Sequence, residues 1–420
     1  MGFASTYLEE RALFPELIKE APDKDTDIIV VVPAYDEPGI AKMLDSLALC
    51  SVPGCSTEVI VVVNAPADAT VESIMNNEIT LENIRRWGRE NSESFFRLYP
   101  VEIKPGHSKD WGVGLARKTG MDEAVHRFSS IGKPDGVILN LDADCQVEKN
   151  YFLAVFNELL IRKERSACSI YFEHPLSGDD YPPAVYAYIV LYELHLRYYF
   201  QGLLYAGFPY VFHTVGSAIG VRALPYIRAG GMNRKRAGED FYFIQKLVPA
   251  GGYFSLNSTA VYPSPRPSFR VPFGTGASIG KMAGSGEAFL LTYNILAFKE
   301  LRSFFGMAED YYLGKYREFT GFYYALPQGV RSFIKEEELY EKLLEIKNNT
   351  SGFPSFKKRF FGWFNMFRVV KYLNHVHSAI YEKKPVSDAA SELLIEKGII
   401  AMPQDQGRLL TIYRSLERGC

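Results

Sequence analysis

The stretch DIIVVVP, residues 27–33, decides the fold class of this chain. Its unbroken β-branched run is typical of a strand that is buried on both faces and that ends at the proline. The same pattern returns in EVIVVVN, residues 58–64, and in GVILNL, residues 136–141. Apolar residues at helical spacing follow the first strand, in residues 39–50, and precede the third, in residues 111–128. Strands that alternate with helices predict an α/β fold, Rossmann-like, with a mostly parallel sheet flanked by helices.

The length of the chain, 420 residues, suits one large domain or two. The sequence pattern turns mostly helical toward the C-terminus, as in KEEELYEKLLEIK, residues 335–347. We therefore predict an N-terminal helical extension over residues 1–24, an α/β domain over residues 25–287 and a mostly helical C-terminal region over residues 288–420.

Composition excludes several classes of protein. Hydrophobic residues make up 47% of the chain and charged residues 23%, which is typical of a globular protein. The net charge of −2 gives no electrostatic basis for binding nucleic acid. The 5 cysteines are scattered without metal-binding spacing, and the N-terminus lacks the apolar core of a signal peptide, so we expect a cytoplasmic protein. The longest apolar stretch, residues 184–212, is interrupted by Glu193, His195 and Arg197 and predicts a buried helix, not a membrane span.

Two aspartates, Asp142 and Asp144, follow the third predicted strand directly. Like charges this close are costly unless a cation lies between them or one of them is protonated. Gln146 adds a third oxygen donor. Oxygen ligands of this kind suit Mg²⁺, which typically binds one or two carboxylates together with substrate phosphates. A polar turn that closes the strand is the alternative interpretation of the same residues.

Three polar loops leave the carboxyl ends of the predicted strands: PAYDEP at residues 33–38, NAPADAT at 64–70 and DADCQ at 142–146. In open α/β sheets, ligands bind outside these strand ends. The order of these loops, followed by GVGLARKTG at residues 112–120 and by GED at 238–240, resembles the family 2 glycosyltransferases. The resemblance covers roughly residues 25–260 and implies the GT-A fold of nucleotide-diphospho-sugar transferases.

The resemblance implies a site for the sugar donor, a UDP- or GDP-hexose. An aspartate usually reads the base where this chain has Asn64, and because an amide both donates and accepts, the base stays open. Arg117 matches a family arginine that approaches the nucleotide, although a solvated helix face is the plain alternative. The residues that the resemblance assigns to the nucleotide-sugar are Pro33, Tyr35, Glu37, Asn64, Arg117, Asp142 and Ala143.

The resemblance also implies a divalent metal, Mg²⁺ or Mn²⁺, with Asp144, Asp142 and Gln146 as ligands. Asp240 matches the family's general base, and its neighbour Glu239 is expected to contact the acceptor. The plain alternative for both acids is that they stabilise the N-terminus of the helix that follows.

Further candidates for contacts with the acceptor or the diphosphate lie downstream; they are His213, Gly216, Ser217, Arg266 and Arg270. The basic and aromatic segment FKKRFFGWFNMFRVVK, residues 356–371, either contacts an anionic membrane surface at the inner face or packs on the catalytic domain.

The expected function is metal-dependent, inverting transfer of a hexose to a hydroxyl of a glycan, a lipid-linked sugar or a small molecule, as in polysaccharide biosynthesis. One alternative is a retaining transferase of the mannosylglycerate synthase type. Another is a non-catalytic sugar-nucleotide-binding protein. An aspartyl-phosphate phosphohydrolase, which also uses two aspartates at this spacing, is disfavoured because its motif follows the first strand.

Overall fold

A computed structural model describes residues 2–104, 111–234, 238–268, 270, 274–399 and 405–419. The chain divides into two compact units. The first contains Met1–Asp180 and Thr214–Gly280, and the second contains Tyr181–His213 and Lys281–Arg418. The prediction placed the division at residue 287 and did not anticipate that Tyr181–His213 groups with the C-terminal region.

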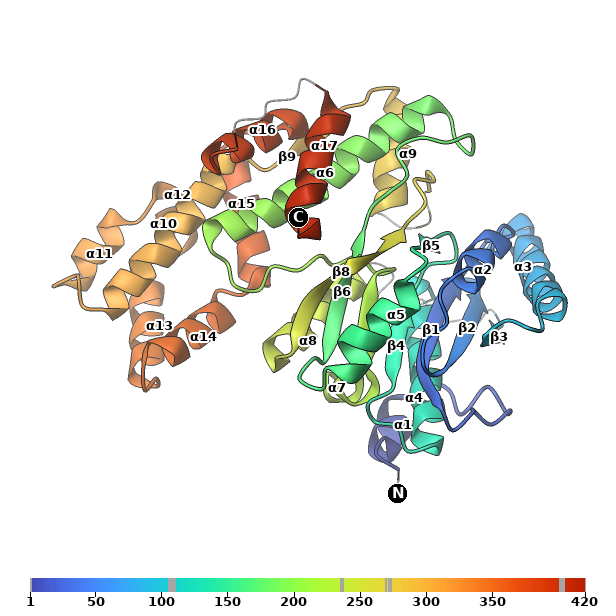
Figure 1. The fold of residues 1–420 in the computed structure, drawn as a ribbon. Coiled ribbons are helices and arrows are strands. Elements are labelled where there is room, and N and C mark those ends of the chain that lie inside the picture. The colour runs from blue at the N-terminus through green and yellow to red at the C-terminus, as the bar shows by residue number, and fades with distance from the viewer. Residues whose placement is uncertain are drawn as a thin grey trace. The chain divides into compact units, whose positions relative to one another are not determined.

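The first unit is built on one sheet, which has eight strands among the described residues, in the order β3-β2-β1-β4-β7-β6-β8-β5 (Figure 1). Four of the strand pairings are parallel and three are antiparallel. The strands are β1 (Thr26–Ala34), β2 (Ser56–Asn64), β3 (Phe96–Ile103), β4 (Val137–Asn140), β5 (Gln146–Val147), β6 (Ala167–Phe172), β7 (Ile219–Arg222) and β8 (Tyr253–Tyr262). The predicted α/β fold with a mostly parallel sheet is confirmed.

Strand β1 lies in the parallel core of the sheet, between β2 and β4. Its residues Ile28–Val32 are fully buried, as the unbroken β-branched run predicts. Helix α4 (Val113–Ser130) packs on β1 and β2. Gly120 makes this close approach possible, because a Cβ at this position would lie 3.0 Å from Val62 Cγ2 and closer still to Val31.

Strand β3 was missed by the sequence analysis. Its sequence, FRLYPVEI, contains Pro100 and is only partly buried, as is common for a strand at the edge of a sheet. The strand that ends at the two aspartates is therefore the fourth along the chain. The chain runs from β1 to β2 and β3 on one side and then to β4 on the other side, so the carboxyl ends of β1 and β4 mark a topological switch point, where a ligand crevice is expected.

The N-terminal extension contains one short helix, α1 (Ser5–Arg11), and is otherwise irregular. Tyr7 donates a hydrogen bond of 2.7 Å to the buried Asp122 of α4. The neighbouring Glu123 accepts hydrogen bonds from the backbone amides of Leu17 (2.8 Å) and Ile18 (3.1 Å). The extension is thus attached to α4 by buried carboxylates.

The remaining helices of the first unit follow the strands on the faces of the sheet. They are α2 (Ala41–Ala48), α3 (Val71–Glu90), α5 (Tyr151–Val155) with a π-helical continuation (Phe156–Ile161), α7 (Ala223–Arg228), α8 (Glu239–Leu247) and a 3₁₀ turn (Val248–Ala250). Helix α9 (Thr275–Ser285) crosses the division between the units.

Within its described residues, the second unit is helical apart from one short antiparallel ladder between β9 (Leu291–Thr292) and β10 (Lys384–Pro385). Helix α6 (Pro183–Ala206), predicted from the long apolar stretch, contacts three other helices of the unit: α10, α16 and α17. Those helices and their neighbours are α10 (Ile295–Tyr312), α11 (Phe319–Ala325), α12 (Gln328–Phe333), α13 (Glu336–Asn348), α14 (Phe353–Trp363), α15 (Met366–Ala379), α16 (Val386–Glu396) and α17 (Gln406–Arg418). The predicted helical C-terminal region is confirmed.

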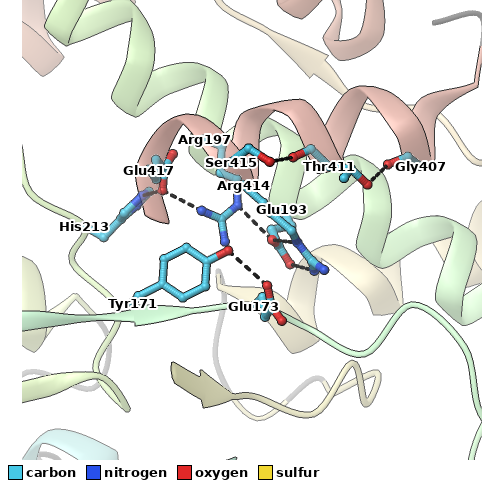
Figure 2. A network of polar contacts seen from close by, with 10 residues as sticks. All are labelled: Tyr171, Glu173, Glu193, Arg197, His213, Gly407, Thr411, Arg414, Ser415 and Glu417. Atoms are coloured by element: carbon cyan, nitrogen blue, oxygen red, sulfur yellow. Dashed lines mark hydrogen bonds and ion pairs between the residues drawn. The ribbon is translucent and has the colours of Figure 1, made fainter. Parts of the chain in front are cut away.

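The charged residues that interrupt the apolar stretch of α6 form a buried network with α17, which Figure 2 shows in close-up. Glu193 accepts hydrogen bonds from Arg197 Nε (2.8 Å) and Arg414 Nε (2.7 Å). Arg197 Nη1 also donates to Glu417 Oε2 at 2.5 Å. Burial of these groups is therefore matched by opposite charges, in line with the expected buried helix. Among the helices that the structure describes, none is long and apolar enough to cross a membrane.

Most of the aromatic residues in the segment 356–371 are buried in the second unit, whereas Trp363 and Phe367 are half-buried. Phe356, Phe360 and Phe361 are buried on α14, while Lys357 on the same helix is exposed. Phe361 packs edge-on against Phe305 of α10, with ring centroids 5.0 Å apart. The aromatic face of this segment thus lies against its own unit, where several of its rings also line a cavity.

Candidate active site

The two aspartates lie on a tight turn after β4. The backbone amide of Leu141 donates to the carbonyl of Val31 on β1 (3.1 Å), which extends the pairing of the two strands. The amide of Cys145 then donates to the carbonyl of Asp142 (3.0 Å), which closes the turn. This turn places Asp142 and Asp144 at the carboxyl end of β4, where the crevice is expected.

Arg117 of α4 connects this turn to a distant part of the chain. Its buried guanidinium donates from Nη2 to Asp142 Oδ1 at 2.5 Å and from Nη1 to Glu239 Oε1 on α8. Burial works against the charge on Arg117, but the carboxylates of Asp142, Glu239 and Asp240 outweigh it, so the pKa of the guanidinium lies above its ordinary value. One arginine thereby holds together the Asp142 turn and the start of α8.

Gly216 provides the space that Arg117 occupies. A Cβ at residue 216 would lie 2.6 Å from Arg117 Cζ, which is closer than van der Waals contact allows. The backbone of the segment before β7 thus packs directly against the Arg117 side chain. Ser217, next to Gly216, is buried.

Glu239 and Asp240 form the first turn of α8, after Gly238 in a left-handed conformation with φ 72°. Asp240 Oδ1 accepts a hydrogen bond of 2.6 Å from the amide of Phe241. Removal from water and the charge of Glu239 raise the pKa of Asp240 to about 7, although Arg117 opposes this shift. A carboxyl group with such a pKa is suited to accepting a proton near neutral pH.

A second charged cluster surrounds Asp144. Arg266 Nη2 lies 3.3 Å from Asp144 Oδ2 and also contacts Glu37 Oε1. Arg270 Nη1 contacts the same Glu37 oxygen at 2.8 Å and donates to the backbone carbonyl of Tyr35. Burial and the neighbouring Glu37 raise the pKa of Asp144 to about 7, against the opposing charge of Arg266. The loop after β1, the Asp144 turn and the two arginines thus meet in one charged cluster.

Asn64, at the end of β2, is buried between α3 and the start of α4. The Asn64 side-chain amide donates to the backbone carbonyl of Gly112 (3.3 Å), and the Asn64 backbone carbonyl accepts from Asn77 Nδ2 (3.0 Å). Asn77 Oδ1 also accepts from the amide of Asp36 (2.9 Å), which has a left-handed φ of 60°. The sequence analysis missed Asn77. The one hint was the aspartate in PAYDEP, because aspartate tolerates the left-handed conformation that the hydrogen bond to Asn77 supports.

Four of the predicted site residues contribute no side chain to the two charged clusters described above. Pro33 and Ala143 are buried and have no polar side chain to offer. The Gln146 side chain is exposed on β5, and no polar contact among the described residues joins it to Asp142 or Asp144. His213 belongs to the second unit, where its Nε2 lies 2.8 Å from Glu417 Oε2 and its ring stacks on Phe200.

Comparison with known families yields a match to the part of the chain that contains Asn64, Arg117, Asp142 and Asp144. Residues 29–223 match the family model described as Glycosyl transferase family 2. This part of the chain is a family 2 glycosyltransferase domain. No curated protein sequence matches the chain significantly.

Solved structures of glycosyltransferases resemble the chain at low sequence identity. S. aureus TarS 1–349 in complex with UDP-GlcNAc is 14% identical, with 94% of this chain and 92% of that chain covered and a TM-score of 0.38. The mannosyltransferase PcManGT from Pyrobaculum calidifontis, in complex with GDP-Man and Mn²⁺, is 14% identical over 99% of this chain and 92% of its own, with a TM-score of 0.35.

The glycosyltransferase domain offers oxygen ligands that fit a divalent cation. No group of three or more His, Cys, Asp or Glu side chains within the described ranges is arranged to hold a metal. Asp142 and Asp144 supply two carboxylates, the number with which Mg²⁺ commonly binds when phosphate oxygens complete its ligands. Burial, and after it the nearby Glu37, raise the pKa of Asp144, and a bound cation would favour its ionised form. The donor set therefore fits Mg²⁺ or Mn²⁺.

Proposed function

We propose that this family 2 glycosyltransferase transfers a hexose from UDP or GDP to a hydroxyl acceptor, with inversion at the anomeric carbon and with Asp240 as the general base. The observation that carries the proposal is the contact of Arg117 with both Asp142 and Glu239. It brings the acidic turn after β4, suited to a metal-bound diphosphate, next to the carboxylates that begin α8.

The donor would lie in the crevice at the carboxyl ends of β1 and β4. Asp142 and Asp144 would hold a divalent cation there, which when bound neutralises the charge of the departing diphosphate. Arg266 and Arg270, which now contact Glu37, carry the charge and planar geometry that suit a diphosphate. Asn64, at the end of β2, leaves the choice between uracil and guanine open.

Transfer would proceed in one displacement. The acceptor oxygen forms a bond to C1 of the hexose while the bond from C1 to the diphosphate oxygen breaks, and the hydroxyl proton passes to the Asp240 carboxylate. Glu239 is held beside Asp240 by Arg117; burial and the neighbouring Glu239 raise the pKa of Asp240, which suits it to accepting this proton. The acceptor would be a hydroxyl of a glycan, a lipid-linked sugar or a small molecule in the cytoplasm.

An assay of transfer and of donor hydrolysis tests the role of Asp240. With UDP- and GDP-hexoses and Mn²⁺, Asp240→Asn should lower kcat by about 10²-fold or more, because general bases contribute roughly 10²–10⁴-fold. Asp179→Asn, an exposed position in the same unit, is the matched control and should keep the wild-type rate.

NMR of the first-formed product would show the inverted anomer. A retained anomer, or an Asp240→Asn rate close to that of the control, would contradict the proposed mechanism and favour a retaining transferase. Absence of turnover with every donor, despite binding, would indicate a non-catalytic sugar-nucleotide-binding protein.

A further inference from the structure

The second unit contains a cavity of about 740 Å³ between the C-terminal ends of α6 and α16 and the helices α10 and α14. This volume falls in the range of small-molecule sites, roughly 300–1,000 Å³. All of its lining residues belong to the second unit, and none of them is among the residues proposed for glycosyl transfer. Six of them are aromatic: Tyr205, Phe305, Phe353, Phe356, Phe360 and Phe361.

The aromatic rings of the cavity are already engaged with their neighbours. Phe361 is edge-on to Phe305 and to Phe360, with centroids 5.0 and 5.1 Å apart. The guanidinium of Arg302 covers the ring of Tyr205 at 4.6 Å from its centroid. Together with the buried Ala206 and Ala308, these rings form an apolar floor of the cavity. A hydrocarbon chain fits such a floor better than a carbohydrate does.

The rim of the cavity is charged, with an excess of cations. Arg302 and Lys357 are exposed, and no ion pair of either is seen among the described residues. Of the acidic residues, Glu396 pairs with Lys299 at 2.6 Å, whereas Glu309 has no ion pair among the described residues. An occupant with a negative head group would therefore find two available cations beside the apolar floor.

We propose that this cavity binds an aliphatic amphiphile with an anionic head group. Its chain lies on the phenylalanines of α10 and α14, and its head group lies beside Arg302 and Lys357. The site is separate from glycosyl transfer and does not depend on the function proposed above.

Gly306 and Lys357 allow this proposal to be tested without disturbing the core. Gly306 lies in α10 on the wall of the cavity, and a Cβ there would meet no atom within 4 Å. Gly306→Trp should therefore fill the cavity, while Gly306→Ala leaves it open and favours the helix. Lys357→Glu reverses a charge at the rim, and Lys358→Glu reverses the exposed neighbour that does not line the cavity.

The test is isothermal titration of the full chain with dodecyl phosphate below its micelle concentration, with inorganic phosphate and dodecyl maltoside as comparison probes. We expect one molecule of dodecyl phosphate to bind per chain, and inorganic phosphate not to bind at this site. Gly306→Trp should weaken binding by about tenfold or more and Lys357→Glu by about fivefold, whereas Gly306→Ala and Lys358→Glu should match the wild type. Circular dichroism and the Tm of each variant confirm that it is folded.

Three results would overturn the proposal. The first is unchanged binding by a folded Gly306→Trp variant. The second is an equal loss in Lys357→Glu and Lys358→Glu, which would show adsorption to the basic surface of α14. The third is equal affinity for dodecyl maltoside, which would show that the head group is not recognised.

Discussion

Asp240 links the chemistry of the site to the stability of the protein. Burial and Glu239 raise its pKa from 3.8 to about 7, so the folded protein binds the proton more tightly than the unfolded chain does. By linkage, the contribution of this group to stability is fully present below about pH 3.8 and is lost as the pH rises through about 7. Above pH 7 the site therefore contains an ionised carboxylate that opposes folding.

We predict from this that Asp240→Asn stabilises the protein at high pH although it impairs transfer. Asparagine keeps the oxygen that accepts from the Phe241 amide and carries no charge. The Tm of the variant should exceed that of the wild type by about 2–4 °C at pH 8 and should approach it at pH 5. Thermal unfolding across this range checks the prediction, with Asp179→Asn as the control. A Tm difference that does not change with pH would contradict it.

At Gly216, the addition of one methyl group should be enough to disturb the site. A methyl group there would overlap Arg117 and displace it from Asp142 and Glu239. We predict that Gly216→Ala lowers kcat/KM for donor turnover by about 10²-fold, because displacements of about 1 Å in an active site have effects of this size. Gly39→Ala is the matched control, since a Cβ at Gly39 would meet no atom within 4 Å. Wild-type kinetics in Gly216→Ala would show that Arg117 does not organise the site.

At the level of single residues, sequence analysis named the charged members of the site but not their partners. Asp142, Asp144 and Asp240 follow from the motifs, whereas the contact of Arg117 with Glu239 joins residues 122 positions apart and depends on the fold. Asn77 was missed for the same reason, because its bond to Asp36 forms only once α3 packs beside the end of β1. The metal and catalytic roles of these residues remain predictions.

At the scale of elements, the local sequence pattern was sufficient to predict the strands that are completely buried. The runs that became β1, β2 and β4 are buried on both faces, and their sequences show it. Strand β3 is half-buried and contains a proline, so its pattern is weak. The long helix α6 was predicted correctly because its apolar stretch is too charged for a membrane and too long for a strand.

The ion network between α6 and α17 gives a prediction about the second unit. Glu193 is fully buried and pairs with both Arg197 and Arg414. Glu193→Ala would leave these two arginines without their shared partner, and we expect a loss of about 3–5 kcal/mol in the free energy of unfolding of this unit. Urea unfolding and hydrogen exchange of α17 measure this effect.

The matched control for this change is Glu345→Ala, which removes an exposed acid that pairs with Lys342 within α13. Exposed pairs of this kind contribute little. Equal effects of the two substitutions would mean that the buried network contributes no more to stability than an ordinary surface ion pair.

At the scale of the whole molecule, the two units have different roles in this account. The candidate transfer residues lie in the first unit, with the exception of His213, while the amphiphile cavity lies in the second. The chain leaves the first unit after Asp180 and returns at Thr214, so a boundary drawn along the sequence could not separate the units. The division depends on the packing of α6 against the C-terminal helices, which are distant in sequence. A local sequence pattern could therefore not predict it.

The central claim is that the first unit holds a nucleoside-diphospho-sugar through a divalent cation at Asp142 and Asp144. A thermal-shift measurement with UDP-, GDP- and dTDP-sugars, with and without Mn²⁺, tests it most directly. We predict that one class of donor raises the Tm of the wild type only when Mn²⁺ is present, since a ligand at 100 times its Kd stabilises the native state by about 2.7 kcal/mol. In Asp144→Asn this metal-dependent rise should disappear. No rise with any donor, or a rise that is the same without Mn²⁺ and in Asp144→Asn, would contradict the claim.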